Sequence, residues 1–356
     1  MEPPAEQETP RRHHRTVVSP ALAGDIRRLK RAAPFLLALL PLGAAFYLAA
    51  VFPCGLAIGP EASWTKPLAP AWRFGLSPKT VSFRSADGIP LKAWWERSWS
   101  AAEPKCTVIL VHGSQSNKTG MGYTAARLLP QGFSVLLLDL RAHGESGGSY
   151  STFDYRESLD VEAAVRWVQA HVGGRIALLG YSSGAVAALL AASRMPGLAA
   201  VVADSAYMDK TDVLRHENVL LAHPPPNVKV PFVYRMRLWL FMAPCCSWLS
   251  REAFRLRTGV AFDGPPGYVR DAIGRIDTPV LYVVSEHDPI VPRAVTEELF
   301  RLTANPRKQL SIQPGTFHSA IGGNPRGYIA TVSAFLDGAL GTTPVPVPDP
   351  TDARLH

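Results

Sequence analysis

The chain has 356 residues, 47% of them hydrophobic and 19% charged, so it has enough apolar side chains to bury a sizeable core. Such a composition excludes a wholly disordered chain. Its 37 Lys and Arg residues against 29 acidic residues give a net charge of +8, and residues 1–31 hold seven of the basic and four of the acidic residues. Because no basic surface with interleaved aromatic residues is visible, we predict no nucleic-acid partner.

An apolar segment without a single charged residue covers residues 32–59. Its 28 residues exceed the length of roughly 20 that crosses a bilayer as a helix. Four basic residues lie just before it, within residues 27–31, and the positive-inside rule therefore makes residues 1–31 a basic cytoplasmic tail. We predict a single-pass membrane protein that is anchored through residues 32–59, with the rest of the chain extracytoplasmic.

Other interpretations of the apolar segment fit the sequence less well. A cleaved signal peptide would have a shorter leader than about 30 residues before its apolar run. Lipidation of Cys54 is disfavoured by the preceding Pro53, and a buried core helix by the length of the uncharged run. Residues 60–77 are predicted to be a Pro/Trp linker, and residues 339–356 a disordered, Pro-rich tail.

The main domain is predicted at residues 78–338 and opens with a hairpin signal at Asp87-Gly88. Apolar runs and helical stripes then alternate along the chain. The strands are expected at 106–111, 134–140, 175–179, 199–203, 280–284 and 309–312, and the helices at 121–129, 156–171, 185–193, 293–302 and 328–336. This order predicts an α/β fold with a mainly parallel sheet and helices on both faces, whose site lies at the carboxyl ends of the strands.

Residues 206–272 interrupt the alternation and are predicted to be a small helical cap inserted into the domain. Within it, the apolar and aromatic residues 231–250 would form a helix with Phe232, Met236, Leu240 and Met242 toward one side. That side either packs over the domain, or forms an acyl-chain pocket or a surface against the bilayer.

A nucleophile is predicted in Gly180-Tyr181-Ser182-Ser183-Gly184, which directly follows the predicted strand 175–179. This matches G-x-S-x-G, a strand-to-helix turn that exposes its central serine, here Ser182. A second match centres on Ser146, but no strand directly precedes it and no helix begins after it. Ser182 is therefore the predicted nucleophile.

The serine needs a base, and the base needs an orienting acid. His318 follows the predicted strand 309–312 and is the expected base, and Asp288 follows the strand 280–284 and is the expected acid. Asp204, after the strand 199–203, is an alternative acid. We expect Glu286 and His287 to be solvated loop residues and His143 to be a structural loop residue.

Two backbone N–H groups are predicted to bind the oxyanion of an acyl intermediate. One belongs to Ser183, directly after the nucleophile, and the other to Ser114, in the loop after the strand 106–111. No metal site is predicted, because the four cysteines form no C-x-x-C pair.

Five motifs together resemble the α/β-hydrolase superfamily, in its serine esterase, lysophospholipase-like and serine aminopeptidase-like branch. They are VHG at 111–113, DLRAHGES at 139–146, GYSSG at 180–184, SEHDPIVP at 285–292 and GTFH at 315–318. The resemblance implies Ser182, Asp288 and His318 as a catalytic triad that needs no cofactor. The chain departs from family patterns at HGSQ, where one branch has HGGG, and at Ala142, where glycine is usual.

The leading hypothesis from the sequence is a membrane-anchored serine hydrolase that cleaves small-molecule or lipid-like carboxylic esters. An amidase, peptidase or thioesterase could use the same triad, and a non-catalytic scaffold could retain the fold. Nothing in the sequence predicts an obligate protein partner.

Overall fold

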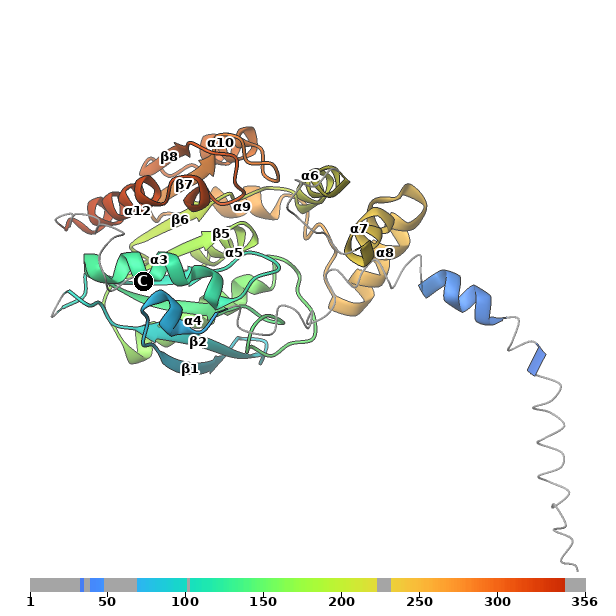
Figure 1. Ribbon diagram of the computed structural model, residues 1–356, viewed down its shortest axis with the longest axis horizontal. Coiled ribbons are helices and arrows are strands. Elements are labelled where there is room, and N and C mark those ends of the chain that lie inside the picture. The colour runs from blue at the N-terminus through green and yellow to red at the C-terminus, as the bar shows by residue number, and fades with distance from the viewer. Residues whose placement is uncertain (1–32, 35–38, 48–68, 101–102, 223–231, 343–356) are drawn as a thin grey trace, which may run out of the picture. The chain divides into compact units, whose positions relative to one another are not determined.

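The computed structural model describes residues 33–34, 39–47, 69–100, 103–222 and 232–342 (Figure 1). The chain divides into two compact units, which are residues 1–48 and residues 49–356. The predicted basic tail, most of the predicted membrane segment and most of the predicted C-terminal tail lie outside the described residues. Residues 39–46 are helical and expose apolar side chains such as Leu42 and Phe46. Within the described ranges, no helix combines the length and apolarity that a membrane crossing requires.

One sheet of eight strands forms the centre of the described part of the second unit, in the order β1-β2-β4-β3-β5-β6-β7-β8. β1 pairs antiparallel with β2, β2 pairs antiparallel with β4, and the other neighbours are parallel. The predicted mainly parallel α/β sheet is thus confirmed. The strands are β1 (Lys79–Arg84), β2 (Pro90–Glu96), β3 (Cys106–Val111), β4 (Phe133–Asp139), β5 (Ile176–Tyr181), β6 (Ala200–Asp204), β7 (Val280–Ser285) and β8 (Lys308–Gln313).

Helices cover both faces of this sheet, as predicted. Side chains alternate between the two faces along a strand, so Ile109 and Val111 of β3 face one core, and Val108 and Leu110 face the other. The first core is covered by α4 (Glu157–His171), α5 (Ser183–Ala192), α9 (Tyr268–Ile273) and α10 (Arg293–Leu302), and the second by α3 (Gly122–Leu128) and α12 (Pro325–Leu340).

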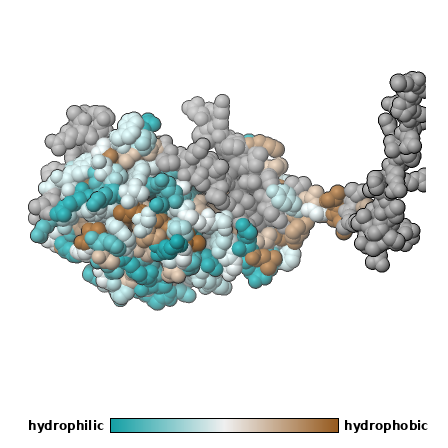
Figure 2. Space-filling view, turned by 90° about the horizontal axis from the view of Figure 1, so that it is seen from below, coloured by the Kyte–Doolittle hydropathy of each residue, from teal (hydrophilic) through white to brown (hydrophobic). Residues whose placement is uncertain are grey.

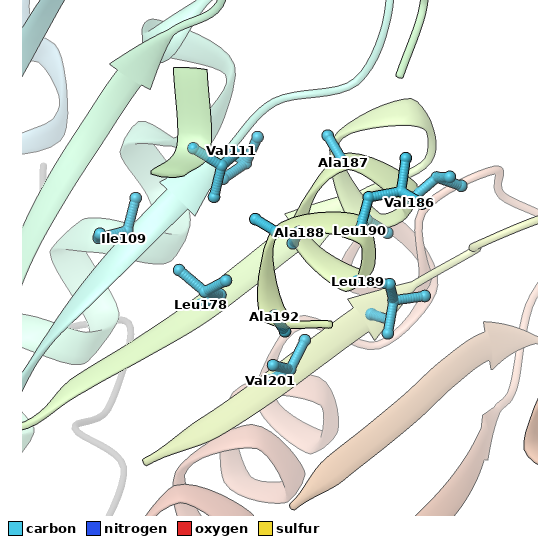
Figure 3. Packing of buried hydrophobic residues seen from close by; sticks show 14 of the residues in the cluster. Ile109, Val111, Leu178, Val186, Ala187, Ala188, Leu189, Leu190, Ala192 and Val201 are labelled. Carbon is cyan, nitrogen blue, oxygen red and sulfur yellow. The ribbon is translucent and has the colours of Figure 1, made fainter. Parts of the chain in front are cut away.

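Helix α5 is buried along its whole length, because its alanines let it pack closely on the central strands. Ala188 and Ala192 lie beside Leu178 of β5 and Val201 of β6 (Figure 3). Leu189 is fully buried, and a leucine buried in this way contributes about 1.5–3 kcal/mol. The same helix begins directly after Ser182, so the core holds the start of α5 in place beside the predicted nucleophile.

The segment between β6 and β7 carries α6 (Lys210–Ala222), α7 (Phe232–Met242), α8 (Pro244–Thr258) and α9. The prediction of a single helix over residues 231–250 is therefore wrong. The helix is interrupted at Ala243, whose backbone is extended. Pro244 explains the break, since a proline disfavours helical geometry in the residue before it and has no N–H for a helical bond. Met236, Leu240 and Met242 are half-buried, whereas Phe232 is 74% exposed.

Packing onto the sheet extends beyond both ends of residues 78–338. Leu76, within the predicted linker, is buried, and the ring of Phe74 packs so tightly on Gly122 that no side chain would fit there. At the other end, Leu340 is buried and Gly341 ends α12 in the left-handed conformation. The surface seen in Figure 2 is mostly polar, with apolar side chains between polar ones.

Candidate active site

Ser182 lies at the sharp turn between β5 and α5 and has a backbone conformation that non-glycine residues rarely adopt, with φ 53° and ψ −121°. Such a conformation costs on the order of 1–3 kcal/mol and is kept only where the surroundings enforce it. The Ser182 N–H donates to the Asp204 carbonyl at 2.8 Å, and the Ser182 carbonyl accepts the Ala185 N–H at 2.9 Å. Hydrogen bonds to β6 and to α5 therefore hold the turn that follows β5.

The two glycines of the motif are required by close backbone contacts. A Cβ atom at Gly180 would overlap the backbone of Gly184 and Ala185, and one at Gly184 would overlap the carbonyl oxygens of Val111 and His112. The glycines thus allow α5 to start directly against β5 and the end of β3, which brings Ser182 beside the loop that follows β3.

His318 is placed beside Ser182 by the loop after β8. Its Nε2 lies 2.9 Å from the Ser182 Oγ, and its Nδ1 lies 3.0 Å from each carboxylate oxygen of Asp288. Because a carboxylate only accepts, the proton lies on Nδ1, and Nε2 is free to accept the serine proton. The structure therefore brings Ser182, His318 and Asp288 together in the order that general-base activation of a serine requires.

Asp288 is buried, and both of its carboxyl oxygens accept hydrogen bonds. Its Oδ1 accepts the backbone N–H groups of Ile290 and Val291, both at 2.9 Å, and its Oδ2 accepts the Ser205 hydroxyl at 2.9 Å. The His318 ring is only 15% exposed. Hydrogen bonds to both carboxylate oxygens fix the direction from which the imidazole is held.

The weaker candidates lie elsewhere or have structural partners. The Ser146 hydroxyl donates to the Asp139 carbonyl at 2.6 Å and accepts the Lys92 N–H at 2.9 Å, so it links β2 and β4. The His143 ring is buried and bonds the Arg141 carbonyl at 2.8 Å. Glu286 and His287 are exposed loop residues, as expected. Asp204 is buried at the end of β6, and its carboxyl group bonds Ser205, whereas the His318 ring bonds Asp288.

Ser183 and Ser114, the expected oxyanion donors, belong to two elements beside Ser182. Ser183 is the first residue of α5, and the first N–H groups of a helix have no acceptor within the helix. Gly113 precedes Ser114 and passes so close that a Cβ atom there would lie 3.2 Å from the Ser182 Cβ. The loop after β3 thus runs beside the serine.

His112 orients this loop, a role that the sequence analysis missed. Its Nδ1 donates to the Gly113 carbonyl at 2.7 Å, and its Nε2 accepts the Leu140 N–H at 3.2 Å. In a trans peptide the C=O and N–H point in opposite directions, so this bond also sets the direction of the Ser114 N–H. Burial lowers the pKa of His112 to about 3, so the ring stays neutral and keeps this proton arrangement.

Tyr181, the residue before Ser182, is a second group that the sequence analysis missed. Its hydroxyl donates to the backbone carbonyl of His318, and the two rings lie 5.1 Å apart. Its ring would also touch a Cβ atom at Gly113, at 3.1 Å. One side chain thus contacts the loops that carry His318 and the expected oxyanion donor Ser114. The only signal in the sequence was its place within the motif.

The family described as serine aminopeptidase, S33, matches residues 102–324, which is more than half of the chain. The chain belongs to this hydrolase family. The uncharacterized protein YqkD of Bacillus subtilis is 26% identical over 242 residues, which cover 67% of this hydrolase and 73% of YqkD. The human serine hydrolase BPHL is 26% identical over 186 residues, which cover 50% of this hydrolase and 61% of BPHL.

Solved structures show that the hydrolase shares its fold with esterases. The esterase Pf2001 of Pyrococcus furiosus superposes with a TM-score of 0.60 and 23% identity, over 77% of this chain and 97% of that one. A thermophilic esterase of Thermogutta terrifontis has a TM-score of 0.51 and 19% identity, over 73% and 99% of the two chains. Both likenesses establish an α/β-hydrolase fold.

The DLRAHGES loop of the hydrolase holds structural ion pairs. Buried Arg141 bonds Asp160 and Asp87 with its guanidinium. Ala142, where the resemblance led us to expect glycine, has a positive φ of 59° and is buried. Its N–H donates to the Gly147 carbonyl at 2.8 Å, so the turn forms with alanine in the left-handed region, which favours glycine.

Proposed function

We propose that the chain is a serine hydrolase that cleaves carboxylic esters through an acyl-enzyme on Ser182. One observation carries the proposal: the Ser182 Oγ lies 2.9 Å from the His318 Nε2, whose ring is held at Nδ1 by Asp288. The strained backbone of Ser182 supports it, because such conformations gather at functional sites.

In this mechanism His318 takes the Ser182 proton as the oxygen attacks the ester carbonyl. Asp288 stabilises the imidazolium that forms, and the N–H groups of Ser183 and Ser114 bind the oxyanion. His318 then gives its proton to the departing alcohol. A water that is deprotonated by His318 attacks the acyl group, and the carboxylic acid leaves with Ser182 restored.

The choice of ester over amide is supported by the structural neighbours whose names call them esterases. The family description, serine aminopeptidase, favours amide bonds as the second candidate. Thioesters are a third substrate class for the same triad. A panel of p-nitrophenyl esters of increasing acyl length, aminoacyl p-nitroanilides and acyl thioesters separates these classes. We expect the ratio of kcat/KM to the uncatalysed hydrolysis rate of the same substrate to be highest for an ester, and a higher ratio for an amide or thioester would overturn the proposal.

Labelling of the full-length chain with a fluorophosphonate probe tests the nucleophile. We expect the wild type and Ser146→Ala to be labelled and Ser182→Ala to be unlabelled. Ser146→Ala is a matched control, because Ser146 lies in the other G-x-S-x-G sequence and its hydroxyl bonds only backbone groups. Labelling of Ser182→Ala, or its loss in Ser146→Ala alone, would show that another serine is the nucleophile.

We further propose that residues 32–59 anchor the enzyme in a membrane, with the catalytic domain extracytoplasmic. The support is the 28-residue uncharged run and the basic residues just before it. This placement would give the enzyme access to lipid-like esters. A reporter enzyme that functions only outside the cytoplasm should be active when it is fused after residue 356. Carbonate washing should leave the chain in the membrane fraction. An inactive reporter or release by carbonate would reject this topology.

A further inference from the structure

Two buried carboxylates lie behind His318, and one hydroxyl joins them. Asp204 ends β6 and Asp288 follows β7, and these strands are parallel neighbours, so their carboxyl ends meet at one edge of the sheet. The Ser205 Oγ lies 3.1 Å from the Asp204 Oδ1 and 2.9 Å from the Asp288 Oδ2. Ser205 has a φ of 53°, which points its side chain into this position at a cost in backbone strain.

The Ser205 hydroxyl has one proton for these two acceptors. If both carboxylates are ionised, the proton can serve only one of them fully, and two negative charges lie buried side by side. If Asp204 is neutral, its O–H can donate to the Ser205 Oγ, which also accepts, and the Ser205 proton is then committed to Asp288. This second arrangement commits the Ser205 proton to Asp288 and avoids two buried anions on either side of one hydroxyl.

We propose that Asp204 is a positioning residue whose neutral carboxyl donates to Ser205, so that Ser205 donates to Asp288 and holds it against His318. This inference rests on the proposed serine hydrolase function. No proton moves along the chain of hydrogen bonds during turnover. Its role is to keep the Asp288 oxygens in place while His318 gains and loses a proton.

The surroundings of Asp204 fit the neutral form. Its carboxyl group is fully buried, and burial raises its pKa to about 7, although the Ala320 N–H, Ser205, His318 and Tyr328 oppose the rise. The Ala320 N–H lies 3.4 Å from Oδ1, and the Tyr328 hydroxyl bonds the same carboxyl.

The other titratable groups facing Asp204 do not change this assignment. Tyr181 and Tyr328 stay neutral, because burial raises the pKa of both phenols well above 10. Asp288 is the anion across Ser205, and a second anion beside it is unfavourable.

Ionisation of Asp204 above about pH 7 would weaken the arrangement, because the Ser205 proton would then be shared between two carboxylates and would no longer be committed to Asp288. We therefore expect kcat/KM of the wild type to fall as pH rises through the Asp204 titration. In Asp204→Asn the amide cannot ionise, so this fall disappears. Its N–H₂ group donates to Ser205 only from the Oδ1 position, where it also faces the Ala320 N–H at 3.4 Å.

The test measures kcat and KM of the full-length enzyme on the best p-nitrophenyl ester between pH 5 and 9. Ser205→Ala and Asp204→Ala should each lower kcat about tenfold or more at pH 6.5 with KM within about twofold, since a hydrogen bond to a charged group is lost. In Asp204→Asn, kcat should fall about threefold. In the double variant Asp204→Ala/Ser205→Ala, kcat should fall no further than in Ser205→Ala alone, because both residues act through the hydrogen bond from Ser205 to Asp288.

Glu286→Gln is the matched control, since it removes an exposed carboxylate near Asp288 that has no part in this chain. Three results would overturn the inference: additive losses in the double variant, an Asp204→Asn loss equal to that of Asp204→Ala, or an unchanged alkaline limb in Asp204→Asn. Thermal unfolding of each variant shows whether it is folded. Fluorophosphonate labelling of the wild type distinguishes failure of this inference from failure of the proposed function, because an unlabelled wild type rejects the serine hydrolase function itself.

Discussion

Replacing Asp288 by asparagine should disable the site while its shape is preserved. The Asp288 Oδ1 faces two N–H donors, those of Ile290 and Val291, so the asparagine must place its oxygen there. Its N–H₂ group then takes the place of Oδ2, 3.0 Å from the His318 Nδ1, while its oxygen stays 3.0 Å from the same nitrogen. Because that oxygen already accepts two backbone N–H groups, we expect the amide N–H to bond the lone pair of Nδ1 and the imidazole proton to move to Nε2. In that tautomer Nε2 donates to the Ser182 Oγ and cannot take its proton.

The expected cost follows from the tautomer. A wrong tautomer in a Ser-His-Asp arrangement lowers kcat by about 10⁴-fold, equivalent to about 5 kcal/mol of transition-state stabilisation. The carbonyl oxygen of the asparagine still accepts the backbone N–H groups, so the thermal unfolding midpoint should change by only a few degrees. Binding of substrate does not use this bond, and KM should therefore stay within about threefold.

The assay compares the wild type, Asp288→Asn and Asp204→Asn on the same p-nitrophenyl ester. Retention of more than a tenth of the wild-type kcat by a folded Asp288→Asn enzyme would refute the reasoning. A larger loss in Asp204→Asn than in Asp288→Asn would instead make Asp204 the orienting acid. The crystal structure of Asp288→Asn should show the His318 ring unmoved, because only the position of the imidazole proton changes.

Three further outcomes follow from other contacts. Gly184→Ala should destabilise the fold by about 3 kcal/mol or more, measured by urea unfolding, because its Cβ overlaps two carbonyl oxygens of the neighbouring backbone; a loss below 1 kcal/mol would contradict this. His112→Ala should lower kcat about tenfold or more with little change in KM, because the Ser114 N–H loses its orientation; an effect on KM alone would contradict it. Burial raises the Asp204 pKa, so the folded state holds this proton more tightly than the unfolded chain does. The free energy of unfolding of the wild type relative to Asp204→Asn should therefore be highest below about pH 4 and fall up to about pH 7, and a flat difference would contradict the raised pKa.

The central strands and the strand-to-helix turn at Ser182 could be predicted because their signals are local. β3 and β5 are short apolar runs, and the glycines around Ser182 are required by contacts within the turn itself or with the next strand. The position of His318 followed from a general rule, since loops after neighbouring parallel strands meet at one edge of the sheet. These inferences needed no knowledge of side-chain packing.

Hydrogen bonds between distant parts of the chain could not be predicted in the same way. Ser205 and Asp288 are 83 residues apart, and Tyr181 and the His318 carbonyl are 137 apart. No spacing rule links such pairs, because their contact depends on the register of the strands and on rotamers. The break before Pro244, by contrast, could have been predicted, because a proline within an apolar run is a local signal for the end of a helix. The prediction of one helix gave more weight to the spacing of the apolar residues than to this proline.

The strained residues of the site share one physical origin. Ser182 and Ser205 both have a φ of 53°, and both directly follow a buried parallel strand, β5 and β6. Each N–H bonds the next strand over, Ser182 to the Asp204 carbonyl and Ser205 to the Val283 carbonyl, so the ladder of the sheet continues one residue past each strand end. The chain must then turn sharply, and these backbone hydrogen bonds of the sheet stabilise both strained turns. The Ser182 hydroxyl beside His318 and the Ser205 hydroxyl beside Asp288 are thus positioned by the backbone of the central strands.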